Sequence, residues 1–130
     1  MKSGLTITTM VVICVLAGCT APTITTEELG KTRETSVGLV FVDSKGMTLY
    51  TYDEDEPGKS NCTGMCAVFW PPAEAVSGAT PSGKFTLVDR ESSPQQWAYN
   101  GMPLYGYIRD EKPGDIAGDG ADGVWHVVRP

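Results

Sequence analysis

The chain has 130 residues, with 10 basic and 16 acidic side chains, a formal net charge of −6 and an isoelectric point near 4.6. This length allows one domain with one modest core. An acidic chain without a cluster of basic residues argues against a nucleic-acid-binding protein and against an electrostatic membrane patch. It leaves cations or basic partner surfaces as ligands, although solubility alone would also account for the charge.

The first 18 residues have the pattern of an export signal. Lys2 supplies a positive charge, and Leu5–Ala17 is uncharged and either apolar or rich in threonine. This run is shorter than the roughly 20 apolar residues of a transmembrane helix, but it suits a signal peptide. Its end, Leu16-Ala17-Gly18-Cys19, resembles a bacterial lipobox, which would make Cys19 the lipid-modified first residue of the mature chain. The alternative is an ordinary secretory signal with a chance cysteine; Cys14 lies in the removed segment.

Residues 19–36 are expected to form a lipid anchor and a flexible tether. Acyl chains such as palmitate on Cys19 would hold the protein on a membrane, because each buried methylene contributes about 0.8 kcal/mol. Thr20–Ser36 is rich in threonine and charge, and as a random coil it would span roughly 20–25 Å. Thr20 stands where aspartate would favour retention in the inner membrane. The resemblance to lipoprotein signals therefore implies the cell envelope, and the outer membrane in a Gram-negative organism.

Two β-hairpins are predicted in the rest of the chain. β-branched and aromatic residues that alternate with polar ones indicate strands, and Asn-Gly between two such runs indicates a tight turn. The expected hairpins are Val37–Val42 with Met47–Tyr52 around the turn Asp43–Gly46, and Gln96–Tyr99 with Met102–Tyr107 around the turn Asn100-Gly101.

Three further elements are expected around these hairpins. Cys62–Trp70 suits a short helix that Asn61 caps and that Pro71-Pro72 ends. Phe85–Val88 is a candidate strand, and Val124–Val128 is a candidate closing strand.

An internal repeat recurs after 55 positions. The segment GMTLYTY at 46–52 matches GMPLYGY at 101–107, and Trp70 matches Trp125. Each half is too small to bury a core of its own. The sequence therefore predicts one domain over residues 37–130, built from repeats at about 37–72 and 85–130. Its class would be mainly β, with α+β as the alternative: two hairpin repeats packed together with a short helical turn.

The repeated residues resemble those of a known family. Tyr50-x-Tyr52-x-x-Asp55 and Tyr105-x-Tyr107-x-x-Asp110 are similar to the Tyr-x-aromatic-x-x-Asp signature of bacterial lipoproteins grouped as the "secreted repeat of unknown function" family. Further matching segments are Cys62-x-Gly64-x-Cys66, Trp70-Pro71-Pro72, Gln96-Trp97 and Trp125–Val128. The resemblance covers about Val37–Pro130. It implies an exported repeat protein, without an established activity.

Cys62 and Cys66 are the two cysteines that follow Cys19. A structural disulfide is favoured, because the protein is exported and this spacing on a helical turn suits a bridge. A redox-active pair is the alternative. Thiol-exchange enzymes usually place Cys-x-x-Cys at the start of a helix in a thioredoxin-like unit, which this sequence does not show.

Metal binding is a weaker hypothesis, and no cofactor is expected. Asp115, Asp119 and Asp122 lie in a glycine-rich loop and are candidate calcium ligands, although their spacing is not that of an EF-hand. Carboxylates that accept hydrogen bonds from turn N–H groups are the simpler interpretation. Copper bound by Met65 and His126, with Met47 or Met102, is a further alternative.

No catalytic set is predicted. A Ser-His-Asp arrangement would need His126, the single histidine, which lies in an apolar strand, and the chain has no Gly-x-Ser-x-Gly segment. A core or hydrogen-bonded histidine is favoured. Tyrosine and tryptophan are abundant, and a core whose tyrosine hydroxyls bond the repeat aspartates is favoured over an exposed recognition patch.

The expected function is that of a non-enzymatic interaction or structural module. Its lipid would anchor it to a membrane, and another envelope protein would be its partner. The alternative is a metal-binding or redox-linked periplasmic accessory protein.

Overall fold

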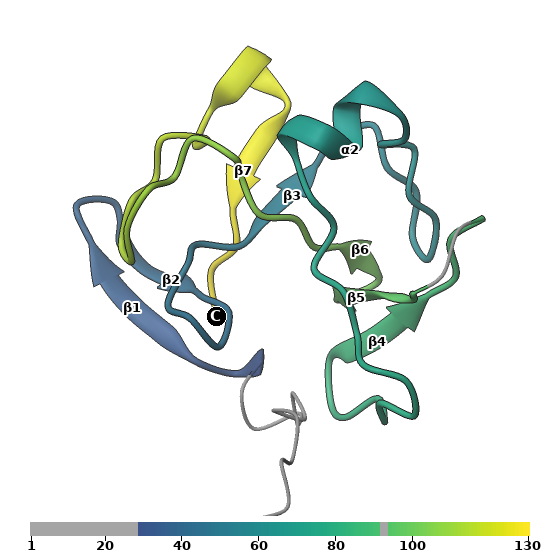
Figure 1. Cartoon of the computed structure of the whole chain (residues 1–130). Helices are drawn as coiled ribbons and strands as arrows, with labels where there is room; N and C mark the ends of the chain where they lie inside the picture. Colours follow the sequence, from purple (N-terminus) through teal and green to yellow (C-terminus); the bar gives the residue numbers. More distant parts are fainter. Residues whose placement is uncertain (1–28, 92–93) are drawn as a thin grey trace, which may run out of the picture.

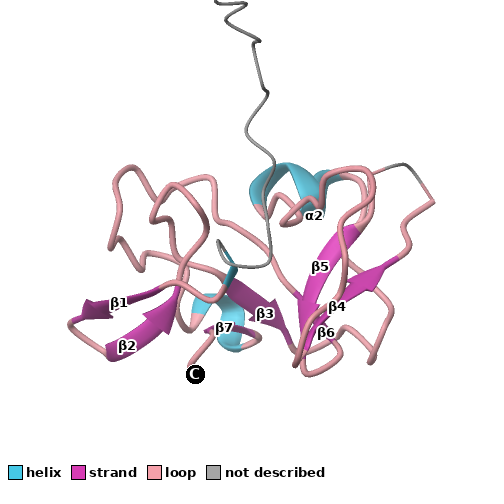
Figure 2. Ribbon diagram, turned by 90° about the horizontal axis from the view of Figure 1, so that it is seen from below, coloured by secondary structure: helices cyan, strands magenta, loops and turns pink. Residues whose placement is uncertain are grey.

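The computed structural model describes residues 29–91 and 94–130, and it confirms a mainly β fold. Within these residues, three small antiparallel sheets are formed, with strand orders β1–β2, β3–β7 and β4–β5–β6. In chain order the elements are β1 (Thr32–Thr35), β2 (Gly38–Phe41), β3 (Tyr50–Tyr52), α2 (Met65–Phe69), β4 (Phe85–Val88), β5 (Gln96–Tyr99), β6 (Met102–Pro103), the 3₁₀ turn η1 (Ala121–Gly123) and β7 (Trp125–Val127). Figures 1 and 2 show β3 and β7 at the centre, with the other two sheets on either side.

The predicted leader, 1–18, and Cys19 with the first part of the tether lie outside the described residues. In the part that the structure describes, no helix is long and apolar enough to span a membrane. The described chain starts with Leu29, whose side chain is buried. Folded structure therefore begins earlier than residue 37.

The first hairpin lies closer to the N-terminus than predicted. β1 occupies residues expected to belong to the tether and pairs with β2. Gly38 follows the connecting turn with a φ of +95°, a conformation that favours glycine. The expected pairing of residues 37–42 with 47–52 is reduced to a bridge between Val42 and Thr48 with a few neighbouring backbone hydrogen bonds.

The centre of each repeat pairs with the end of the other repeat. β3 pairs with β7, so that Tyr52 lies opposite Trp125. In the equivalent place, Gly106 N donates to Pro71 O at 2.8 Å, and Tyr105 forms a bridge with Pro72. Because proline has no N–H to donate, this second pairing stays a bridge and does not extend into a strand.

An approximate twofold axis passes between Tyr50 and Tyr105. Tyr50 N donates to Tyr105 O at 2.8 Å, and Tyr105 N donates to Tyr50 O at 2.9 Å. Bonds farther from the axis recur at the same displacement: Val128 N to Leu49 O and Ala73 N to Leu104 O. The repeat in the sequence is therefore also a repeat in the structure. The two copies are joined because the centre of each one pairs with the end of the other.

The helix is shorter than predicted. α2 begins at Met65, after Gly64 with a φ of +59°, and its C-cap is Trp70. Asn61 does not cap this helix, since its Nδ2 donates to Glu54 O at 2.8 Å. Gly64, with its positive φ and a ψ of −128°, does not continue a helical backbone, so Cys62 lies outside the helix. The predicted disulfide between Cys62 and Cys66 is present.

The second hairpin has the predicted turn, but its second strand is shorter than the predicted Met102–Tyr107, because β6 ends at Pro103. Tyr105 instead forms bridges with Tyr50 and Pro72. β4, β5 and β6 form one antiparallel sheet, and Asn100 and Gly101 connect β5 to β6 with φ values of 51° and 82°. Positive φ at both residues is the pattern of a type I′ turn, whose twist suits a hairpin.

Two buried clusters hold the repeats together, and each contains residues from both. Leu49 and Leu104 lie in one cluster, while Tyr50 and Tyr105 lie in the other, because side chains alternate between the two faces of a strand. The first cluster comprises Leu29, Phe41, Leu49, Ala75, Trp97, Leu104 and Val128. The second comprises Val40, Val42, Tyr50, Cys62, Trp70, Tyr105, Trp125 and Val127.

Candidate functional site

The first tyrosine and the aspartate of each motif are bonded across the repeats. Tyr50 Oη donates to Asp110 Oδ2 at 2.7 Å, and Tyr105 Oη is 2.7 Å from Asp55 Oδ2 in the same arrangement. The other carboxylate oxygen holds the following loop: Asn61 N donates to Asp55 Oδ1, and the equivalent bond reaches Asp110. These four motif residues are buried, so they stabilise the fold and are not exposed to a ligand. We call them the framework.

Burial alters the protonation of this framework. It raises the pKa of Tyr50 and Tyr105 above the ordinary tyrosine value, and the hydrogen bond to a carboxylate raises it further. Burial also raises the pKa of Asp55 and Asp110, while the hydrogen bonds that they accept oppose that rise. The tyrosines therefore stay protonated donors over the physiological pH range.

The second aromatic residue of each motif belongs to a column of four rings. Trp70 and Trp125 stack at its centre with centroids 3.8 Å apart. Tyr52 stacks on Trp125 at 4.4 Å, and Tyr107 stacks on Trp70 at 4.0 Å. Tyr52 and Tyr107 are half-buried, in contrast to the tyrosines on the axis. The column alternates between the two repeats, so its rings are fixed only when both repeats are folded.

A groove of about 780 Å³ lies along this column, between α2 and η1. All four rings line it, together with apolar side chains of α2. Met65 is 67% exposed and Phe69 is 43% exposed. Glu54, Arg109 and Asp122 supply charged groups among the same lining residues. This groove is the candidate site, because it combines exposed apolar groups with a rigid aromatic wall.

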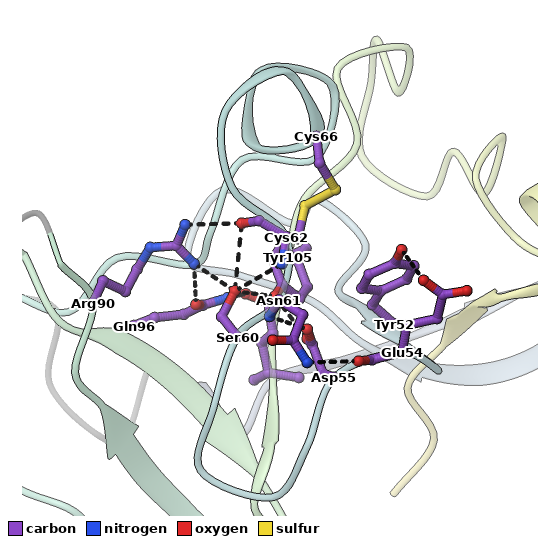
Figure 3. The surroundings of a disulfide bond; sticks show 11 residues. Tyr52, Glu54, Asp55, Ser60, Asn61, Cys62, Cys66, Arg90, Gln96 and Tyr105 are labelled. Atoms are coloured by element: carbon purple, nitrogen blue, oxygen red, sulfur yellow. Dashed lines mark hydrogen bonds between the residues drawn. A yellow bond between two sulfur atoms is a disulfide. The ribbon is translucent and has the colours of Figure 1, made fainter.

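The disulfide connects this groove to a partly buried polar network, which Figure 3 shows. Cys62 is buried, whereas Cys66 lines the groove. Arg90 Nη1 donates to Ser60 Oγ at 2.8 Å and to Gln96 Oε1 at 2.7 Å, and Nη2 donates to Cys62 O at 3.0 Å.

Ser60 continues the network to the framework, since its Oγ is 2.7 Å from Tyr105 Oη. Sequence reasoning missed Arg90 and Ser60. Neither belongs to the repeated pattern, and only the fold brings them together.

The three candidate calcium ligands are not brought into one cluster. Asp115 Oδ2 accepts hydrogen bonds from Glu111 N and Lys112 N, which lower the pKa of its carboxyl group. Asp119 Oδ1 accepts from Val127 N at 3.1 Å, and Asp122 lines the groove. Across residues 29–91 and 94–130, no three His, Cys, Asp or Glu side chains are grouped to hold a metal ion.

His126 is hydrogen-bonded but lies on the surface. Its Nε2 is 2.8 Å from Asp53 Oδ2, and the two side chains are 46% and 52% exposed. Of the two predicted positions, in the core or hydrogen-bonded, the structure shows the hydrogen-bonded one. The alternation of β7 buries Trp125 and Val127 and leaves the histidine between them at the surface.

Comparison with known proteins agrees with this duplicated architecture. No curated protein and no solved structure matches the chain. A family model described as a secreted repeat of unknown function matches residues 31–74 and again residues 86–129. The two matches start 55 positions apart, which is the displacement between Tyr50 and Tyr105. They cover most of the chain, and the protein belongs to this family of secreted repeats.

Proposed function

We propose that the protein is a lipid-anchored module of the cell envelope that acts by binding another envelope protein, without catalysis and without a cofactor. The order Leu16-Ala17-Gly18-Cys19 supports the anchor, and the secreted nature of the family supports an extracytoplasmic location. Thr20 after the anchor favours the outer membrane in a Gram-negative organism.

The groove carries this proposal. Met65 and Phe69 are one helical turn apart on α2, so they present apolar surface together. They adjoin the aromatic column, whose stacking leaves little conformational freedom for a partner to remove on binding. Exposed apolar groups next to charged ones are typical of a protein interaction site.

The burial and hydrogen bonding of the polar side chains favour binding over catalysis. The framework tyrosines and aspartates are buried and bonded to one another. The histidine is paired with Asp53 on the surface, and neither residue is among those that line the groove. A general acid or base would have to reach a substrate, and no polar group of the framework is exposed to one.

Site-specific photo-crosslinking in intact cells tests this proposal. A photoreactive residue at Phe69 should form a discrete adduct with one envelope protein, and Met65→Glu should abolish that adduct. The matched control is the same photoreactive residue at Leu39, a 42% exposed apolar residue of β2 that does not line the groove. Equal labelling at both positions, or no discrete adduct at Phe69, would refute a binding role for the groove.

A metal-binding or redox-linked accessory role is the second candidate. It is favoured by one observation, that Cys66 of the disulfide lines the same groove. A native mass spectrum of the mature protein from its own membrane separates the two. A bound metal, or reduced core cysteines, would support the accessory role. A lipidated chain lighter by two hydrogens with nothing bound would support the binding module, and an unmodified Cys19 would refute the anchor.

A further inference from the structure

A basic pocket forms where the described chain begins. Lys31, Arg33 and Lys45 line a cavity of about 400 Å³ at the turn Asp43–Gly46. The mature chain has nine Lys and Arg residues, since one of the ten is Lys2 in the leader, and three of the nine meet in this pocket. The linear sequence has no basic run, so it predicted no basic patch. The fold creates one by bringing residue 45 back to the start of β1.

The backbone holds these cations in place. Lys31 O accepts a hydrogen bond from Val42 N at 2.9 Å, which fixes the start of β1 beside the turn. Arg33 lies in β1 and Lys31 directly precedes that strand, and both residues line the pocket, whereas Glu34 does not. A Cβ atom on Gly46 would lie 3.2 Å from Arg33 Nη2, so this guanidinium lies directly over the turn.

The three cations have no carboxylate partner in the part of the chain that the structure describes. The salt bridges found there are Lys59–Glu56 and His126–Asp53. Asp43 is the carboxylate in the pocket lining, and its Oδ1 accepts hydrogen bonds from Lys45 N and Met47 N, both at 2.9 Å. Asp43 thus stabilises its own turn, and the pocket keeps an excess of positive charge in an otherwise acidic protein.

The pocket is also close to the proposed anchor along the chain. Lys31 follows Cys19 by 12 positions. Even fully extended, twelve residues reach no farther than about 43 Å. The anchor would therefore keep the pocket near the lipid surface, where anionic headgroups attract basic residues within a Debye length of about 8 Å. In Figure 1, α2 lies at the end of the molecule away from the start of β1.

We propose that Lys31, Arg33 and Lys45 bind the phosphate groups of anionic phospholipids in the membrane that carries the anchor. The start of β1 and the turn at Gly46 then rest on the lipid headgroups, and the aromatic groove is directed away from the membrane. This inference rests on the proposed lipid anchor for its biological setting, but the binding itself does not require acylation.

Vesicle flotation of the mature chain, made without lipid as the Cys19→Ser variant, tests the pocket directly. The chain should float with vesicles of phosphatidylcholine that contain phosphatidylglycerol, and not with vesicles of phosphatidylcholine alone. Each of Lys31→Gln, Arg33→Gln and Lys45→Gln should weaken binding about five-fold, and Arg33→Lys should retain most of it. Added salt should weaken binding further.

The triple variant Lys31→Gln/Arg33→Gln/Lys45→Gln should lose most of the binding. A control triple variant at Lys59, Lys84 and Arg129, each changed to Gln, removes the same formal charge outside the pocket and should bind like the parent chain. Equal loss in both triple variants, or no loss in the pocket variant, would overturn the proposal. A third measurement adds inorganic phosphate, without vesicles, to the Cys19→Ser chain. If phosphate shifts the amide NMR signals around Lys31 while the chain fails to float, the site takes free anions and the lipid assignment is wrong.

The proposed lipid anchor and the proposed phospholipid site can be refuted independently. The mass of Cys19 in the protein from its own membrane tests the anchor alone, whereas flotation of the Cys19→Ser chain tests the pocket alone.

Discussion

Trp70 and Trp125, at equivalent positions in the two repeats, stack with their ring centroids 3.8 Å apart and only 3° between their planes. Tyr52 and Tyr107 continue the stack on either side, so each repeat supplies alternate rings. In one repeat alone, both faces of its tryptophan would lack a stacking partner, because both partners belong to the other repeat. The aromatic wall of the groove is therefore a property of the whole domain.

Gly118→Ala should destabilise the domain by about 1–3 kcal/mol. A Cβ atom at Gly118 would lie 2.7 Å from Trp70 Cη2 and 3.0 Å from Tyr107 Cδ1, closer than such contacts allow. The rings cannot move aside, because they are held in the stack. Urea unfolding measures the change as a lower midpoint at an unchanged m-value.

Gly30→Ala is the matched control for this substitution. A Cβ atom at Gly30 meets nothing within 4 Å, so the free energy of unfolding should change by less than about 0.5 kcal/mol. Equal effects of the two variants would contradict the tight packing of Gly118 against the column.

The stability of Asp55→Asn relative to wild type should increase as the pH rises. The pKa of Asp55 in the folded protein is raised above its ordinary value of 3.8. The folded state therefore holds this proton more tightly than the unfolded chain does, and the stability that it contributes below pH 3.8 is lost as the pH passes through the raised pKa. Urea unfolding of both proteins from pH 3 upwards checks this.

Asp115→Asn should show the opposite trend. The pKa of Asp115 is lowered by hydrogen bonds from Glu111 N and Lys112 N. Its contribution is present above the ordinary value of 3.8 and is lost as the pH falls through the lowered pKa, so this variant should lose stability relative to wild type as the pH rises. Parallel trends in the two variants would show that the carboxyl environments are not as described.

Reduction of the Cys62–Cys66 bond should lower the free energy of unfolding by about 2 kcal/mol, as the chain-entropy model gives for so short a loop. Urea unfolding with and without dithiothreitol measures this. The double variant Cys62→Ala/Cys66→Ala should not respond to the reductant. A wild-type protein that is equally insensitive would show that the bridge contributes nothing to stability.

Arg90→Lys should destabilise the domain by about 1–3 kcal/mol, because charge-assisted hydrogen bonds contribute more than neutral ones. The guanidinium makes three bonds, to Ser60, Gln96 and the carbonyl of Cys62, and an ammonium group cannot reproduce this planar arrangement. Thermal or urea unfolding gives the value.

Lys59→Ala provides the comparison for Arg90. Lys59 pairs with Glu56 on the surface, where both side chains are more than 60% exposed, so its loss should cost less than about 0.5 kcal/mol. If both substitutions have the same small effect, the Arg90 network is not a structural element.

Local chemistry explains the elements that could be predicted. Asn100-Gly101 specifies a tight turn because both residues tolerate positive φ, and the second hairpin follows from it. The strand Phe85–Val88 and the disulfide also follow from local pattern and spacing. Each of these features depends on residues that are close in the sequence.

Expectations failed where the decisive partner is distant in the sequence. The polar residues of β1 predict a tether, because they give no local sign that this segment pairs with β2. The turn at 43–46 predicts that β3 pairs with the segment just before it, whereas its actual partner, β7, lies more than 70 positions away. The helix start at Met65 depends on the backbone of Gly64, which the apolar pattern does not report.

The sequence by itself determined the duplication, the mainly β class, the disulfide and the residues of the family motif, because each follows from residue identity and spacing. Only the tertiary structure decided that Tyr50 bonds to Asp110 and Tyr105 to Asp55, that four rings from two repeats form one column, and that Lys31, Arg33 and Lys45 share a pocket. The physical reason is that neither repeat can bury its own core. Each repeat therefore depends on strands and side chains of the other. These contacts join residues that are distant in the sequence, so no local pattern encodes them.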